Sequence, residues 1–266
     1  MSDRDFDLTW TPFLTLVHRD LLRFWRVITQ TLVVPLVNTT LYLMIFGVSL
    51  GKGISLPGGI PYLAFLIPGL VMMAVLNNSF QNSSSSIATS RFHGELEDLR
   101  VVPLSPLQIT AALGVGGVAR GVLVGIVTWL VGEEFYHYTG QGWLGVAHPL
   151  ILALFLCLGG LAFAFLGVVI AFWSKSIDQL SLVGGFIILP LLYLGGVFFP
   201  LERLSPAWRT ISTFNPMLYF INGVRYGILG SCDVSLWVAV SISFVTLILL
   251  MGLAFRTVRR SSYGRW

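Results

Sequence analysis

The stretch PLILALFLCLGGLAFAFLGVVIAFW (residues 149–173) decides the fold, because it is long, apolar and free of charged side chains. A helix crosses the hydrocarbon core of a bilayer with roughly 20 consecutive, mostly apolar residues. A helix on the surface of a soluble protein instead keeps one polar face. The stretch therefore predicts a membrane-spanning helix.

Five more runs of this kind lie on either side of it, and each is bounded by charges, polar loops or clusters of Pro and Gly. They cover about residues 27–50, 62–80, 107–132, 180–199 and 236–255. The 266 residues are 55% hydrophobic and only 11% charged, with a mean hydropathy of +0.83. A soluble fold cannot bury so large an apolar share. We expect an all-α integral membrane protein, with residues 27–266 forming a transmembrane domain of six spans.

The positions of Lys and Arg predict the orientation, because basic flanks resist translocation and stay in the cytoplasm. One side of the expected spans collects Arg4, Arg19, Arg23, Arg26, Arg91, Arg100, Lys175, Arg256, Arg259, Arg260 and Arg265. The other side has only Lys52, Arg203, Arg209 and Arg225. With six spans, this bias places both termini in the cytoplasm. The net charge of +4 is then a topology signal and gives no reason to expect nucleic acid as a partner.

Residues 1–26 are predicted to form a cytoplasmic leader. Their acidic, polar start lacks the basic-then-apolar order of a cleaved signal peptide. Within residues 13–26 the charges occupy one helical face, and the opposite face carries Leu14, Val17, Leu21, Leu22 and Trp25. This pattern predicts an amphipathic helix in the membrane interface, with Trp25 near the level of the headgroups.

Residues 200–230, between the fifth and sixth runs, alternate short apolar stretches with Pro206, Asn215-Pro216 and Gly223. A segment broken this often cannot cross a bilayer. We expect two half-helices that dip in from the outer face and return, which form a re-entrant outer segment.

Residues 90–106 join the second and third runs on the cytoplasmic side. Their many charges allow a solvated turn as one interpretation. However, Leu96, Leu99 and Val102 are spaced for one apolar face of a short helix that Pro103 ends. Such a face suits docking into a groove on a soluble partner.

Two blocks of the sequence carry a family resemblance. The first is Arg91, then Gly94-Glu95-Leu96-Glu97, then Pro103-Leu104-Ser105. The second runs from Gly195-Gly196-Val197-Phe198-Phe199-Pro200 through Leu204-Ser205-Pro206-Ala207-Trp208 and Phe214-Asn215-Pro216-Met217-Leu218-Tyr219 to Gly223 and Arg225. They resemble the coupling segment and the outer signature of ABC-2-type exporter permeases, such as those for nodulation factors, capsule polysaccharides and drugs. Together with the six spans and the leader, the resemblance covers nearly the whole chain.

The resemblance implies a homodimer that works with two copies of a cytoplasmic ATPase in the inner membrane of a bacterium, in contact with membrane lipids. No Gly-x-x-x-x-Gly-Lys-Ser/Thr loop occurs in the sequence, so ATP and Mg would be bound by the ATPase and this chain would need no cofactor. The coupling residues would be Arg91, Gly94, Glu95, Leu96, Glu97, Asp98, Leu99 and Arg100. The outer gate would comprise Phe198, Phe199, Pro200, Asn215, Pro216, Tyr219 and Arg225.

Polar residues within the apolar runs are candidates for a translocation path, because lipid disfavours them. The candidates are Asn38, Tyr42, Asn77, Asn78 and Gln81. From Gln81 onward, an extension of the helix into the cytosol is the alternative. A stripe of Gly117, Gly121 and Gly125 in the third run is expected to serve close helix packing.

Three charged residues lie in or at the end of the third run. Arg120 either reaches to lipid headgroups or handles substrate or lipid. Glu133 and Glu134 precede an aromatic group, so an interface boundary is favoured over a substrate-binding or proton-linked pair. His137 and His148 make no convincing metal site with them.

The sequence therefore predicts a transport subunit without catalytic residues, which exports a large or amphipathic substrate such as a lipid-linked saccharide, polysaccharide, lipid or drug. One alternative is a lipid- or acyl-transferring membrane enzyme that uses His93, Glu133, Glu134 or His137. That enzyme would need its groups at one depth, whereas His93 is expected at the opposite face from the others. The other alternative is a secondary transporter, for which no convincing internal repeat is seen.

Overall fold

The computed structural model describes residues 3–51, 59–92 and 104–263, and every regular element in these ranges is a helix. Six helical segments are long and apolar enough to cross a membrane: Ile28–Ser49, Tyr62–Arg91, Pro106–Tyr138, Pro149–Trp173, Ile177–Leu194 and Leu236–Arg260. The predicted all-α fold with six spans is confirmed. The third span is longer than predicted, because its helix continues through Glu133 and Glu134 to Tyr138.

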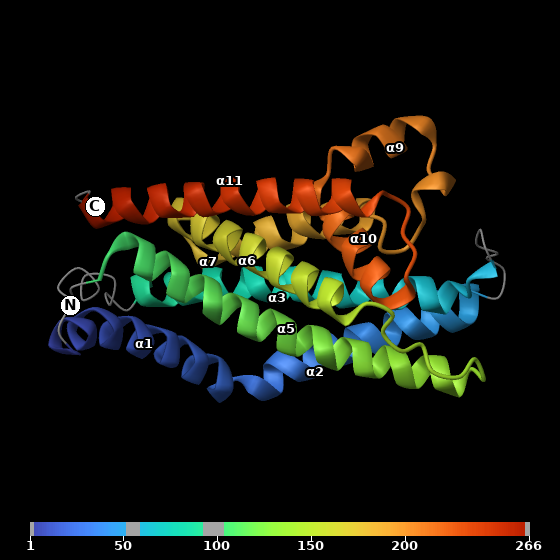
Figure 1. The fold of residues 1–266 in the computed structure, drawn as a ribbon, viewed down its shortest axis with the longest axis horizontal. Helices are drawn as coiled ribbons and strands as arrows, with labels where there is room; N and C mark the ends of the chain where they lie inside the picture. Colours follow the sequence, from blue (N-terminus) through green and yellow to red (C-terminus); the bar gives the residue numbers. More distant parts are fainter. Residues whose placement is uncertain (1–2, 52–58, 93–103, 264–266) are drawn as a thin grey trace.

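Helix α3 (Tyr62–Phe92) forms the centre of the bundle, with α5 (Pro106–Tyr138) and α6 (Pro149–Trp173) packed along it. The apolar span of α3 is 89% buried. Helix α11 (Leu236–Tyr263) packs against α6 on the other side. In Figure 1 both termini lie at one end of the bundle, together with the end of α3 and the start of α5.

The glycine stripe of α5 lies in the contact with α3 and α6. A Cβ atom at Gly117 would lie 2.6 Å from the Cβ of Ala164, and one at Gly121 would lie 2.8 Å from the carbonyl oxygen of Val75. Both distances are too short for real carbon atoms, so the helix backbones approach as closely as only glycine permits. The predicted packing role of the stripe is confirmed.

The first and fifth spans are the least regular. Helix α2 (Ile28–Tyr42) continues as the π-helix η1 (Leu43–Leu50). The fifth span consists of α7 (Ile177–Leu182), the π-helix η4 (Val183–Ile188) and α8 (Leu189–Leu194). Only 22% and 17% of these spans are buried, so most of their apolar surface faces outward.

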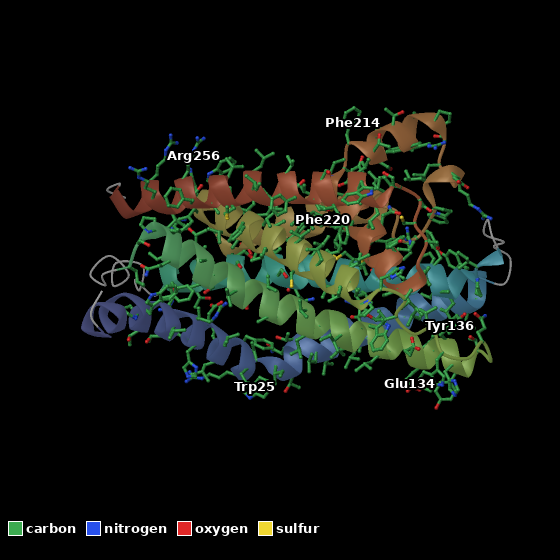
Figure 2. The ribbon with its side chains drawn as sticks, viewed as in Figure 1. Trp25, Glu134, Tyr136, Phe214, Phe220 and Arg256 are labelled. Atoms are coloured by element: carbon green, nitrogen blue, oxygen red, sulfur yellow. The ribbon has the colours of Figure 1, made fainter. Side chains whose placement is uncertain are left out.

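The leader forms α1 (Asp3–Arg26), which packs against α5. The predicted apolar face is exposed at Leu14 and Trp25, and Figure 2 shows Trp25 pointing away from the bundle. Leu16 and Phe24 are buried instead, and Asp20 lies between them with 4% exposure. The prediction that the charges of this helix lie on a separate face is wrong for Asp20, because polar groups of α3 receive its carboxylate.

Residues 200–230 contain the short 3₁₀ turn η5 (Leu201–Arg203) and two helices, α9 (Pro206–Thr213) and α10 (Pro216–Leu229). Helix α10 is buried among α3, α6 and α11, whereas α9 lies outside the bundle (Figure 1). Figure 2 shows the difference at Phe214, which is 84% exposed, and Phe220, which is fully buried. The two expected helices are present, and only the second belongs to the core.

Candidate functional site

A cavity of about 540 Å³ lies between α3, α5 and the fifth span. It is lined by Asn77, Phe80, Gln81, Ser84, Ser85, Ala88, Thr89, Arg120, Ile177, Leu180, Ser181, Gly184, Gly185 and Leu189. The polar lining comes mainly from α3 and the apolar lining mainly from the fifth span. The cavity is therefore a candidate binding site for a molecule with both kinds of surface.

The cavity gathers some of the residues predicted for the translocation path, but not all of them. Asn77 and Gln81 line it, and Arg120, which was predicted separately, joins them. Asn78 points elsewhere: its amide donates to the carbonyl of Ala74 at 3.0 Å, one turn back in α3. Asn38 is exposed on α2, away from the cavity.

Tyr42, the remaining candidate for the path, belongs to an aromatic cluster near the predicted outer gate. Its ring contacts Phe46 and Phe198 with centroids 6.3 and 5.5 Å apart, and Tyr193 of α8 lies 5.2 Å from Phe198. The hydroxyl groups of Tyr42 and Tyr193 share a hydrogen bond of 3.2 Å. The first span is thus joined to the fifth span and to Phe198, a residue of the predicted outer gate.

Arg225 holds the outer segment together from inside α10. Its side chain is 1% exposed and donates to the carbonyl of Gly196 at 2.8 Å. Its guanidinium lies 3.5 Å from a carboxylate oxygen of Asp233 and 3.8 Å from the ring centre of Phe65. Gly196 adopts a φ of 85°, a conformation that glycine takes without strain. Arg225 therefore fixes the turn that leads from α8 into the outer segment.

Asn215 and Pro216 begin α10 as the N-cap and the first helical residue, which are positions that Asn and Pro favour. The side-chain oxygen of Asn215 accepts a hydrogen bond from the backbone N–H of Met217 at 3.1 Å, while its amide donates to the carbonyl of Leu191 at 2.6 Å. Pro216 occupies the first helical turn, where no N–H is needed. Tyr219 donates to the carbonyl of Thr213 at 2.8 Å. These residues have a clear structural role, and their predicted part in a gate stays a prediction.

Phe198, Phe199 and Pro200 follow this turn and point in different directions. Phe198 is 6% exposed in the aromatic cluster, and Pro200 is also buried, whereas Phe199 is 46% exposed. Only Phe199 of the three offers its ring to the surroundings.

Glu133 and Glu134 do not act as a pair. Glu133 is 5% exposed, and one of its carboxylate oxygens accepts a hydrogen bond from the backbone N–H of Gly145 at 3.1 Å. Glu134 is exposed and points away from the bundle in Figure 2. Glu133 thus anchors the loop that follows α5, which agrees with the favoured boundary interpretation.

The predicted coupling segment lies mostly outside the described residues, including Gly94, Glu95, Leu96, Glu97, Asp98, Leu99 and Arg100. Of its members, Arg91 is described. Its guanidinium donates to the carbonyl of Ser174 at 2.8 Å, at the end of α6. Arg91 thus ties the end of α3 to the start of the connection between the fourth and fifth spans.

Sequence reasoning missed a polar network that joins α1 to α3. The carboxylate of Asp20 accepts hydrogen bonds from Ser86 at 2.7 Å and Asn82 at 3.0 Å. Arg23 lies 3.4 Å from the same carboxylate and donates to the carbonyl of Asn82 at 2.9 Å. Burial lowers the pKa of the Arg23 guanidinium, and Asp20 acts in the opposite direction. The available signal was the row Leu16, Asp20 and Phe24, which places an acid between two apolar residues on one face.

A comparison with known families identifies the chain. The sequence model described as "ABC-2 type transporter" matches residues 11–229, which include most of α1, the cavity and α10. The chain belongs to the ABC-2 type transporter family. The resemblance seen in the sequence is thereby confirmed.

Individual relatives agree with this family assignment. The chain is 38% identical over 229 residues to the protein named inner membrane transport permease YadH of Escherichia coli K12, covering 86% of this chain and 87% of the relative. It is 30% identical over 216 residues to nodulation protein J of Neorhizobium galegae, covering 80% and 79% of the two chains. The named transport permease supports a transport role for this ABC-2 chain.

Among the groups suggested for a membrane enzyme, Glu133 and His137 are engaged in structural contacts. Within the described ranges, no three His, Cys, Asp or Glu residues gather as metal ligands. His137 stacks on Trp143 with centroids 4.5 Å apart, and Glu133 is engaged with the backbone of Gly145. His93 lies outside the described residues. This arrangement gives no support to the alternative of a transferase.

Proposed function

We propose that this ABC-2 chain is the permease subunit of an ATP-driven exporter, which moves a large or amphipathic substrate out of the cytoplasm or the inner leaflet. The observation that carries the proposal is the cavity between α3, α5 and the fifth span. It combines a polar wall with an apolar wall inside a domain of six spans. Lipid-linked saccharides, polysaccharides, lipids and drugs are the substrate classes considered.

The orientation with both termini in the cytoplasm is supported by the end of the bundle at which they lie. Figure 1 places the two termini together, and the end of α3 and the end of α11 supply the basic residues Arg91 and Arg260 there. Positively charged flanks are retained in the cytoplasm of bacteria. We assign the protein to the cytoplasmic (inner) membrane on this basis.

A homodimer is supported by the outward face of the first span. This face is apolar at Val34 and Val37, which are 58% and 52% exposed, but it also carries the exposed amide of Asn38. An amide is costly in lipid, and a protein partner or a polar path would offset that cost. We assign this face, together with the poorly buried fifth span, to contact with a second copy.

Two copies of a cytoplasmic ATPase complete the proposed complex and bind the ATP and Mg. The attachment points would be α1 and the segment from Arg91 to Arg100. Arg91 already connects α3 to the end of α6, so movement at this segment would reach the central span and one packed along it.

Copurification tests the proposal. The tagged full-length chain is purified from its native host in mild detergent, and the sample is analysed for an associated ATPase subunit and for ATP hydrolysis. We then expect ATP-dependent movement of a fluorescent amphiphile in liposomes that contain the complex. A complex without an ATPase, combined with no ATP-dependent transport, would refute the proposed function.

A second test addresses coupling. Glu97→Gln and Leu96→Ala are expected to keep membrane insertion and ATP hydrolysis but to lose transport. Arg256→Gln, at an exposed site on α11 shown in Figure 2, serves as the control and is expected to behave as wild type. Loss of insertion in the loop variants would mean that the segment is only structural.

A further inference from the structure

Arg120 is a charged side chain within the third span, and it lines the cavity. Its Nε atom is inaccessible and has no hydrogen-bond partner among the described residues. The side chain is thus enclosed by the protein at Nε and reaches the cavity. A cation in this position without a counter-charge is costly.

The surrounding charges do not compensate Arg120. Among the described residues the ion pairs are Arg23 with Asp20 and Arg225 with Asp233, so no described acid is paired with Arg120. The carboxylate of Asp20 is already in contact with Arg23, Asn82 and Ser86. None of the described residues that line the cavity is acidic. The described side of the cavity is therefore left positive at Arg120.

The wall next to Arg120 offers further hydrogen-bonding groups. Gln81 donates to the side-chain oxygen of Asn77 at 3.4 Å, which leaves the amide group of Asn77 available as a donor. The opposite wall is apolar at Ile177, Leu180 and Leu189. A ligand with a charged head and an apolar body would contact both walls.

The fifth span leaves room for such a body. Gly184 and Gly185 line the cavity, and a Cβ atom at Gly185 would meet no atom within 4 Å. The volume of about 540 Å³ lies in the usual range for small-molecule sites.

We propose that the cavity binds an amphiphile with an anionic headgroup, a phosphate or a carboxylate, through Arg120, and that this class of molecule is the substrate. The planar guanidinium donates to both oxygens of such groups, which fits it to this task better than a lysine. The inference rests on the proposed function, since it names the substrate of that same cavity.

Binding to the purified full-length chain tests the first part. The probes are dioctanoyl phosphatidic acid, the zwitterionic dioctanoyl phosphatidylcholine with the same tails, and inorganic phosphate alone. We expect wild type to bind phosphatidic acid at least about tenfold more tightly than phosphatidylcholine. Arg120→Gln is expected to lose this preference, Arg120→Lys to keep part of it, and the surface control Arg256→Gln to keep all of it.

The arms of this experiment separate the possible sources of the anion. Inorganic phosphate is expected to compete only at far higher concentration, because it makes no use of the apolar wall. Competition by phosphate at the same concentration as phosphatidic acid would overturn the assignment to an amphiphile. An unchanged preference in Arg120→Gln would overturn the role of Arg120. If Arg120→Gln fails to fold, Arg120→Lys is used instead. The role of Arg120 would be overturned if Arg120→Lys kept the full wild-type preference for phosphatidic acid and if salt did not weaken the binding of phosphatidic acid.

ATP hydrolysis by the copurified complex tests the second part. We expect phosphatidic acid, and not phosphatidylcholine, to stimulate hydrolysis in wild type but not in Arg120→Gln. Binding without stimulation would mean a resident lipid and would overturn the substrate assignment. Intact ATP-dependent transport with no preference for anionic amphiphiles would refute this inference alone. The absence of an ATPase from the complex would instead refute the proposed function.

Discussion

Replacing Asp20 by Asn should loosen α1 from the bundle. The carboxylate accepts hydrogen bonds at both oxygens, from Ser86 at 2.7 Å and from Asn82 at 3.0 Å. An amide has one oxygen and no charge, so Asn can accept from Asn82 and donate to the Ser86 hydroxyl only through neutral hydrogen bonds. The substitution also removes the negative charge that faces Arg23 at 3.4 Å.

The expected cost follows from these contacts. Weakening two charge-assisted hydrogen bonds to neutral ones costs about 1 kcal/mol each. The ion pair adds at most about 1 kcal/mol, because the Arg23 side chain is 32% exposed and solvent screens it. We expect the free energy of undocking α1 to fall by about 3 kcal/mol, which raises the undocked population roughly 100-fold.

Thiol labelling measures this population directly. Leu16 is 5% exposed on the buried face of α1, so Leu16→Cys should react with a maleimide only when α1 undocks. Cys157 and Cys232 are free and are replaced by serine in every variant. The labelling rate at position 16 should then rise roughly 100-fold with Asp20→Asn.

The matched control is Asp178→Asn, which removes an exposed acid from the first turn of α7. It should leave the labelling rate unchanged. A rise of less than about threefold with Asp20→Asn, or an equal rise with both variants, would refute the reasoning, because the network would then not hold α1 in place.

Three further variants test the cavity and the core. Gly185→Leu should fill open space in the cavity and reduce ATP-dependent transport about tenfold, whereas Gly252→Leu, with equal room outside the cavity, should not. Arg225→Met should destabilise the purified chain by about 3 kcal/mol in thermal unfolding, because its carboxylate and carbonyl partners lose a buried cation. The exposed Arg209→Met should change stability by less than about 0.5 kcal/mol. Gly121→Val should cost about 2 kcal/mol in the same assay, because its Cβ atom would overlap α3, and Gly252→Val supplies the comparison. A cost for Gly252→Val equal to that for Gly121→Val would contradict the packing argument.

The spans could be predicted because the free energy of placing a helix in a bilayer is close to a sum of contributions from its individual residues. Each residue of a lipid-facing helix must be tolerable in hydrocarbon, so a run such as residues 149–173 shows its structure in its composition alone. The fourth helix begins and ends where the sequence predicted. The third helix extends beyond its apolar run, because Glu133 and Tyr136 are accommodated by burial in the protein, which composition does not record.

The partners of charged residues could not be predicted in this way, because they depend on which helices meet. Arg225 was recognised within a motif, but its contact with Asp233 arises from the loop after α10. Asp20 is paired with α3 across more than sixty positions of sequence, and Arg120 meets Gln81 only through the cavity. Helix contacts of this kind are set by side-chain packing between spans, which no local pattern encodes.

For the polar run of α3, helical periodicity could have predicted from the sequence which residues share a face. Its residues divide into two faces: Asn77, Gln81, Ser84, Ser85 and Ala88 line the cavity, whereas Asn78, Ser79, Asn82, Ser83 and Ser86 are buried against other helices. On each face the residues recur after three or four positions, such as 77, 81, 84 and 88 or 79, 82 and 86, as a helical period requires. The buried face holds α1 through Asp20 and contacts α5, where Ser83 donates to the carbonyl of Leu113 at 3.0 Å. One polar stretch of α3 therefore both lines the cavity and holds the neighbouring helices α1 and α5. A displacement of α1 that pulls on the buried face must also move the cavity wall, since both faces share a single rigid backbone.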